Sequence, residues 1–114
     1  MSRRMANCRA IKGNGQLMST VRVCVLRAAL RLQGCRSLKE KRRRLGGLRD
    51  KFGRHSGLAV CESGCNDELA RGEWQFVAAA TSVPVVQKML AEVERHLRGA
   101  VDAELLMLER EWLV

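Results

Sequence analysis

The clearest pattern in the chain is a strict alternation of apolar positions over residues 20–32. One face of this segment consists of Cys24, Leu26, Ala28, Leu30 and Leu32. Arg27 and Arg31 fall on the other face, together with several valines and an alanine. A period of two residues predicts a β-strand. Because the first half of the segment is apolar on both faces, we expect a central strand of a sheet.

A capped amphipathic helix is predicted to follow this strand. Ser37 and Glu40 form a capping box, in which the serine hydroxyl accepts from the N–H of Glu40 and the glutamate reaches back to the N–H of Ser37. The apolar stripe of the helix is Leu38, Leu45, Leu48 and Phe52. Gly53 is predicted to end it. Gly46-Gly47 in its middle predicts either very close packing against the sheet or fraying, because glycine is a poor helix former.

The remaining patterns predict strands over 58–63, 74–82 and 103–113, with a loop from 64 to 72. Ser82 and Pro84 begin a second helix that Gly99 ends. Its apolar stripe is Val86, Met89, Leu90, Val93 and Leu97. The order β-α-β-β-α-β predicts an α+β ferredoxin-like sandwich, a four-stranded antiparallel sheet with two helices on one face. We expect a single domain at 20–114, preceded at 1–19 by a basic, disordered extension.

Charge divides the chain into two unequal halves. The formal net charge is +9 at pH 7. Residues 1–54 carry 16 Lys and Arg against 2 acids, whereas residues 55–114 carry 5 against 10. A basic half favours a polyanionic or acidic partner, and it also permits head-to-tail self-association.

The basic residues gather at the start of the first predicted helix and in the turn before it. We take six of them as candidate nucleic-acid-binding residues: Arg36, Lys39, Lys41, Arg42, Arg43 and Arg44. A helix N-terminus beside clustered Lys and Arg favours phosphate. The alternative is a solvated helix face that binds nothing.

Aromatic residues are scarce, so few side chains could stack on nucleic-acid bases. Only 4% of the residues are aromatic and there is no tyrosine. Trp74 and Phe76 share one face of a predicted strand and are the candidates for stacking or for an oligomer interface, provided that this face is open. The alternative is that both belong to the core.

No catalytic, metal or cofactor site is indicated, and we expect a protein that is not an enzyme. Cys61 and Cys65 lack a second pair at zinc-ligand spacing, and the acids near residues 62–73 are expected to be solvated rather than to hold Mg²⁺. His96 is expected to complement the negative end of the second helix. Five cysteines without a signal peptide or an apolar span predict reduced thiols in the cytoplasm, away from membranes.

One segment resembles a known family. Leu30-Arg31-Leu32 followed by the run from Gly34 to Arg42 is similar to the signature of the YlxP-like family, a small bacterial family of unknown function. Weaker similarities occur at Val60-Cys61-Glu62, at Asp67, at Arg71, and at 103–106 and 109–111, so the resemblance covers roughly residues 20–114. It departs at Leu69-Ala70, where the family tends to have an aromatic residue or His followed by Gln.

The resemblance implies a ferredoxin-like fold without an established activity, and a gene context beside translation factors. It therefore favours a non-enzymatic RNA- or ribosome-associated protein that uses the basic segment. The alternative is a structural or regulatory homo-oligomer, or a protein-binding module, that uses the open face of the sheet.

Overall fold

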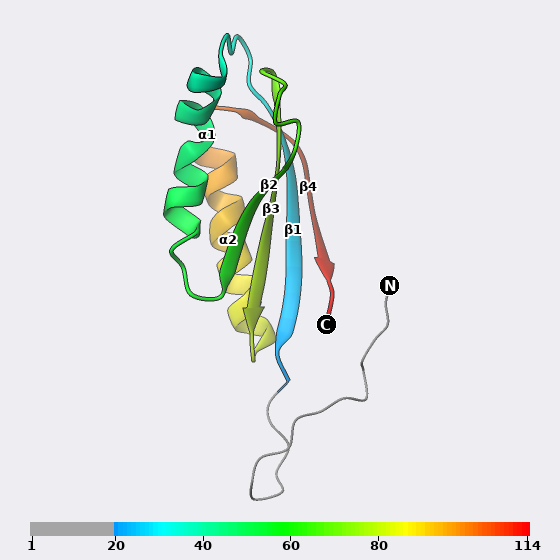
Figure 1. Cartoon of the computed structure of the whole chain (residues 1–114). Helices are drawn as coiled ribbons and strands as arrows, with labels where there is room; N and C mark the ends of the chain where they lie inside the picture. Colours follow the sequence, from blue (N-terminus) through cyan, green and yellow to red (C-terminus); the bar gives the residue numbers. More distant parts are fainter. Residues whose placement is uncertain (1–19) are drawn as a thin grey trace, which may run out of the picture.

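The computed structural model describes residues 20–114, and the extension predicted at 1–19 lies outside the described residues. The elements are β1 (Arg22–Arg31), α1 (Leu38–Phe52), β2 (Leu58–Gly64), β3 (Arg71–Ala80), α2 (Val83–Gly99) and β4 (Glu104–Trp112). The strands form one antiparallel sheet in the order β2-β3-β1-β4. Both helices cover the same face of this sheet (Figure 1). The predicted ferredoxin-like architecture is confirmed.

β1 is the central strand around which the core forms. The alternating residues Cys24, Leu26, Ala28, Leu30 and Leu32 form the inner face: they are at most 2% exposed, and they pack with the apolar stripe of α2 in one cluster. β3 pairs with the whole length of β1, from Arg22 opposite Ala80 to Arg31 opposite Arg71. This pairing starts β3 at Arg71, three residues before the predicted start.

α1 differs from its predicted apolar stripe at one position. Leu45, Leu48 and Phe52 are buried, but Leu38 is 40% exposed. Lys41 takes the fourth position of the stripe and is only 3% exposed. Residues 41, 45, 48 and 52 follow the spacing of one helix face, so a lysine occupies a core position of this helix.

The glycine pair of α1 does not fit either prediction made for it. Gly46 and Gly47 lie within a continuous helix, so the helix does not fray there. A Cβ added at either position would meet nothing within 4 Å, so neither glycine marks close packing against the sheet. Each costs about 1 kcal/mol relative to alanine in a helix, and no contact made by the described residues accounts for that cost.

The start of α1 follows the sequence closely, with one change in the capping box. Ser37 Oγ accepts from the N–H of Glu40 at 3.0 Å, as predicted. The carboxylate of Glu40, however, accepts from the N–H of Arg36 at 3.3 Å, one residue before the predicted donor. The cap therefore also orders the turn that precedes α1.

At α2, Ser82 is the N-cap residue but its side chain makes no capping hydrogen bond. Gly99 is the last helical residue, followed by Ala100 as the C-cap.

Candidate nucleic-acid interface

Lys41 is a clamp between α1 and the hairpin loop that joins β2 to β3. Its Nζ donates to the carbonyl oxygens of Cys65 and Glu68, each at 2.6 Å. The carboxylate of Glu62 lies 4.0 Å from the same nitrogen. Because these contacts occupy the buried ammonium group, Lys41 is not available to a nucleic acid.

Arg44 is a second clamp, one turn further along α1. Its guanidinium donates to the carbonyl oxygens of Asp102 and Gln33, both at 2.9 Å, and forms ion pairs with Glu40 and Asp102. The side chain is only 9% exposed. It therefore joins the loops before α1 and after α2, which lie at the same end of the molecule (Figure 1).

Four of the six basic candidates remain at the surface. Arg36, Lys39, Arg42 and Arg43 are exposed, and none forms an ion pair with another residue in the range 20–114. We call these four residues the α1 cationic face. The internal partners of Lys41 and Arg44 hold the loops against the helix, so the α1 cationic face lies on a fixed support.

A cavity of about 350 Å³ adjoins the α1 cationic face at Arg42. Its apolar wall includes Leu45 and Trp74, and its polar wall includes Arg49 and Asn66. The guanidinium carbon of Arg49 lies 5.6 Å from the centre of the Trp74 ring, a cation–π contact. Sequence patterns did not indicate this cavity, because its residues come from α1, β2, β3 and the loop between the two strands.

Trp74 and Phe76 do not lie on the open face of the sheet. They are 4% and 0% exposed, respectively, and belong to the core beneath the helices. Phe76 packs edge-on against Phe52, with the ring centres 6.0 Å apart. Burial excludes both rings from stacking on a base at the open face. Trp74 keeps a different role, because it lines the cavity beside Arg49.

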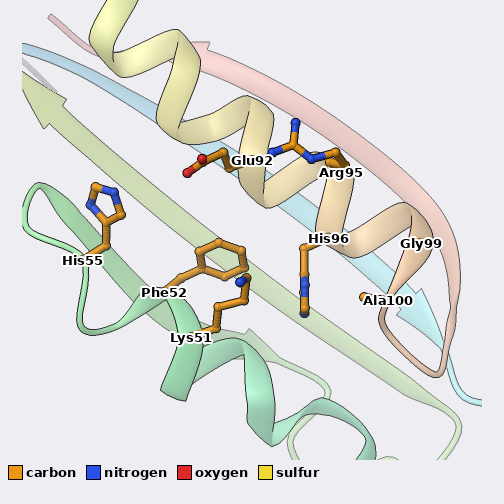
Figure 2. A pocket seen from close by; sticks show the side chains of 8 residues that line it. All are labelled: Lys51, Phe52, His55, Glu92, Arg95, His96, Gly99 and Ala100. Atoms are coloured by element: carbon orange, nitrogen blue, oxygen red, sulfur yellow. The ribbon is translucent and has the colours of Figure 1, made fainter.

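A second cavity, of about 480 Å³, lies between the end of α1 and α2. Figure 2 shows His55, Phe52 and His96 among its lining residues, with Phe52 between the two histidines in this view. Burial, and then the positive charge of Lys51, lowers the pKa of His96. Both effects disfavour the charged form of His96 and so oppose the predicted role of its charge at the end of α2.

The cysteine at the start of the β2–β3 loop is a poor nucleophile. Cys65 has a φ of 58°, and its thiol donates to Glu73 at 3.5 Å. Hydrogen bonding to Glu68, burial and the nearby charges of Glu68 and Glu73 raise the pKa of Cys65 to about 11. The thiolate is the reactive form of cysteine, so this environment opposes a redox role for Cys65.

The rate of alkylation should show the low reactivity of Cys65 directly. At neutral pH we expect Cys65 to hold about 100-fold less thiolate than a thiol of ordinary pKa 9.0, and so to react with iodoacetamide correspondingly slowly. The rate should keep rising until about pH 11. Peptide mass spectrometry would follow the reaction, with the exposed Cys61 as the comparison within the same chain. Glu73→Gln should speed the reaction at pH 7. A plateau below pH 9 would contradict the assignment.

Residues 20–114 contain neither a cluster of metal-ligating side chains nor a membrane-spanning helix. No group of three or more His, Cys, Asp or Glu side chains gathers there in a way that could hold a metal ion. Within the same range, no helix combines the length and apolar character needed to cross a membrane.

Comparison with known proteins identifies a family but does not identify an activity. No curated protein matches the chain. A family model described as "Protein of unknown function (DUF503)" matches residues 23–110. The match contains both clamps, the α1 cationic face and the cavity. The chain therefore belongs to this family of proteins of unknown function.

Proposed function

We propose that the protein binds RNA through the α1 cationic face, without catalysing a reaction. The observation that carries this proposal is the division of the six basic residues into two clamps and four exposed cations. Internal acids and carbonyls satisfy Lys41 and Arg44, whereas the four residues of the α1 cationic face have no acidic partner between residues 20 and 114. Unpaired cations on a fixed surface attract the phosphates of a polyanion.

The resemblance to the YlxP-like family supports one particular class of polyanion. The segment from Gly34 to Arg42 resembles the YlxP-like signature, whose gene context points to bacterial translation. We therefore propose ribosomal RNA, in the cytoplasm of a bacterium, as the natural polyanion. The four cysteines between residues 20 and 114 are all free, which suits a reducing compartment.

The test is binding to ribosomal subunits and to a structured fragment of ribosomal RNA over a series of salt concentrations. Four phosphate contacts should give a log–log salt slope of about −3. The double variant Lys39→Glu/Arg43→Glu should bind at least about 30-fold more weakly, and its salt slope should become shallower by about 1.5, because two of the four contacts are lost. Neither residue lines the cavity.

The matched control reverses two exposed arginines of α2, Arg95 and Arg98, and so makes the same change in net charge elsewhere. This control should bind nearly as well as the unaltered protein. Equal losses in the two double variants would show that only net charge matters. Binding that does not depend on salt would contradict the proposal.

As a second function, we propose homo-oligomerisation through the open sheet face. The supporting observation is an apolar strip there in which the half-buried Val77 lies between the exposed Ala59 and Val25, which is itself only 4% exposed. Met107, opposite Ala29, is 42% exposed. An uncovered apolar strip marks an interaction surface. Val77→Lys should then shift the sedimentation coefficient to that of one copy, and a monomer at every concentration would exclude this function.

A further inference from the structure

Neither backbone conformation nor close packing among the described residues requires a glycine at position 46. Its side of α1 is open, since an added Cβ would meet nothing within 4 Å. Gly47 has the same freedom. The difference is that Gly46 lines the cavity beside Arg49 and Gly47 does not. The missing side chain at Gly46 leaves that cavity open, which is what close approach of a ligand to a backbone requires.

The walls of the cavity combine three kinds of chemistry. Leu45 and Trp74 supply an apolar surface, and Arg49 lies over the Trp74 ring. Arg42 and Arg49 are exposed cations. Asp50 and Glu62 add carboxylate acceptors, and the amide of Asn66 can both donate and accept.

This combination selects among ligand classes. A simple phosphate would meet Asp50 and Glu62 as well as the arginines, and the two carboxylates would repel it. A purely apolar ligand would leave Arg42 and Asp50, which form no ion pair among residues 20–114, without partners. A ligand that carries a flat ring, N–H donors and a phosphate would find a partner on each wall of the cavity. The arginines would bind the phosphate, the carboxylates would accept from the N–H groups of the ring, and the guanidinium of Arg49 would offer a flat surface for stacking.

We propose that this cavity binds a single nucleotide unit of the RNA. The proposal deepens, and rests on, the function proposed above, because Arg42 belongs both to the cavity and to the α1 cationic face. The cavity volume of about 350 Å³ lies within the range of roughly 300–1,000 Å³ found for small-ligand sites. An unpaired nucleotide enters beside Gly46 while its neighbours in the strand lie along the cationic face.

Trp74 provides a direct readout. The chain has two tryptophans, so Trp112→Phe leaves Trp74 as the sole indole fluorophore. In this background, AMP, GMP, CMP and UMP are titrated separately, with inorganic phosphate as the reference anion. We expect a saturable fluorescence change with at least one nucleotide and none with phosphate. An equal change with phosphate would reduce the cavity to an anion site and overturn the proposal.

The decisive comparison is Gly46→Leu against Gly47→Leu in the same background. Both substitutions place a good helix former where space is open, so both variants should keep the circular dichroism of the parent. Gly46→Leu should weaken nucleotide binding at least about tenfold by filling the cavity, while Gly47→Leu should leave it unchanged. Equal behaviour of the two variants, or no saturable change with any nucleotide, would overturn the proposal.

The two proposals can fail separately. RNA binding could keep its salt slope and its dependence on Lys39 and Arg43 while Trp74 shows no response to nucleotides. That result would contradict the nucleotide site in the cavity and would still support RNA binding by the α1 cationic face. Loss of RNA binding in Lys39→Glu/Arg43→Glu with normal mononucleotide binding supports both. Absence of RNA binding in the unaltered protein removes the proposed function itself.

Discussion

Lys41→Met should lower the free energy of unfolding by about 3 kcal/mol, although methionine nearly matches the length of lysine and is a better core residue. The substitution keeps the packing of the buried stem and removes only the ammonium group. The carbonyl oxygens of Cys65 and Glu68 then lose a donor at 2.6 Å, and Glu62 loses the nearby positive charge. The cost is that of leaving partly buried acceptors and a carboxylate without their partner.

Urea unfolding followed by circular dichroism would measure this loss. The control is Arg43→Met, which makes the same kind of change two residues away at an exposed position without an ion pair among residues 20–114. It should change stability by less than about 0.5 kcal/mol. Amide hydrogen exchange in the loop of residues 65–70 should also accelerate in Lys41→Met. If both variants unfold at the same urea concentration, the clamp has no energetic role.

Gly57→Ala is the second large effect, with an expected loss of about 3 kcal/mol. Gly57 has a φ of +92°, and an added Cβ would lie 2.9 Å from the carbonyl oxygen of Ala79 and 3.3 Å from Met89 Sδ. Its own carbonyl accepts from the N–H of Ala79 at 2.8 Å. Backbone strain and a backbone clash therefore act together at the turn that leads from α1 into β2.

Gly34→Ala separates the effect of backbone strain from that of the steric clash. Gly34 has a φ of +70°, but an added Cβ meets nothing within 4 Å, so only the backbone strain of about 1 kcal/mol should remain. Thermal unfolding of the two variants measures the difference. A loss at Gly57 no larger than the loss at Gly34 would show that the contact with Ala79 relaxes at no cost.

The proposals of RNA binding and of a nucleotide site in the cavity depend on the same feature of α1. A helix with seven basic residues could present all of them to solvent, as the solvated-face alternative requires. Here Lys41 and Arg44 hold loops in place. Of the exposed basic residues of α1, Arg42 and Arg49 line an open cavity. The number of cations that could contact RNA therefore falls from six to four, with Arg49 added at the cavity. That reduction is what makes the salt slope a quantitative test.

Several features were predicted correctly because they depend only on neighbours in the sequence. The serine of the capping box lies three residues from its donor. The stripe of α2 repeats at helical spacing, and all five of its residues are buried. The alternation over β1 places one set of residues in the core. Each of these patterns lies within one element, so its period determines the type of element and, for the two helices, the buried side.

The errors concern residues whose partners are distant in the sequence. Lys41 reaches carbonyl oxygens 24 and 27 residues away, and Arg44 reaches one 58 residues away. A basic side chain in a charged run gives no local sign that it will be buried. Trp74 and Phe76 were placed together on one face of β3, but alternation cannot tell which of the two faces a helix will cover.

The order of elements, the start of α1 and the identity of most core residues thus follow from the chain alone, because local periodicity and capping specify them. The division of the basic segment into clamps and exposed cations arises only when the loops after β2 and α2 fold back onto α1. The cavity beside Gly46 has the same origin, since four separate segments line it. Burial depends on which groups meet across the fold, and that information is absent from any one stretch of sequence.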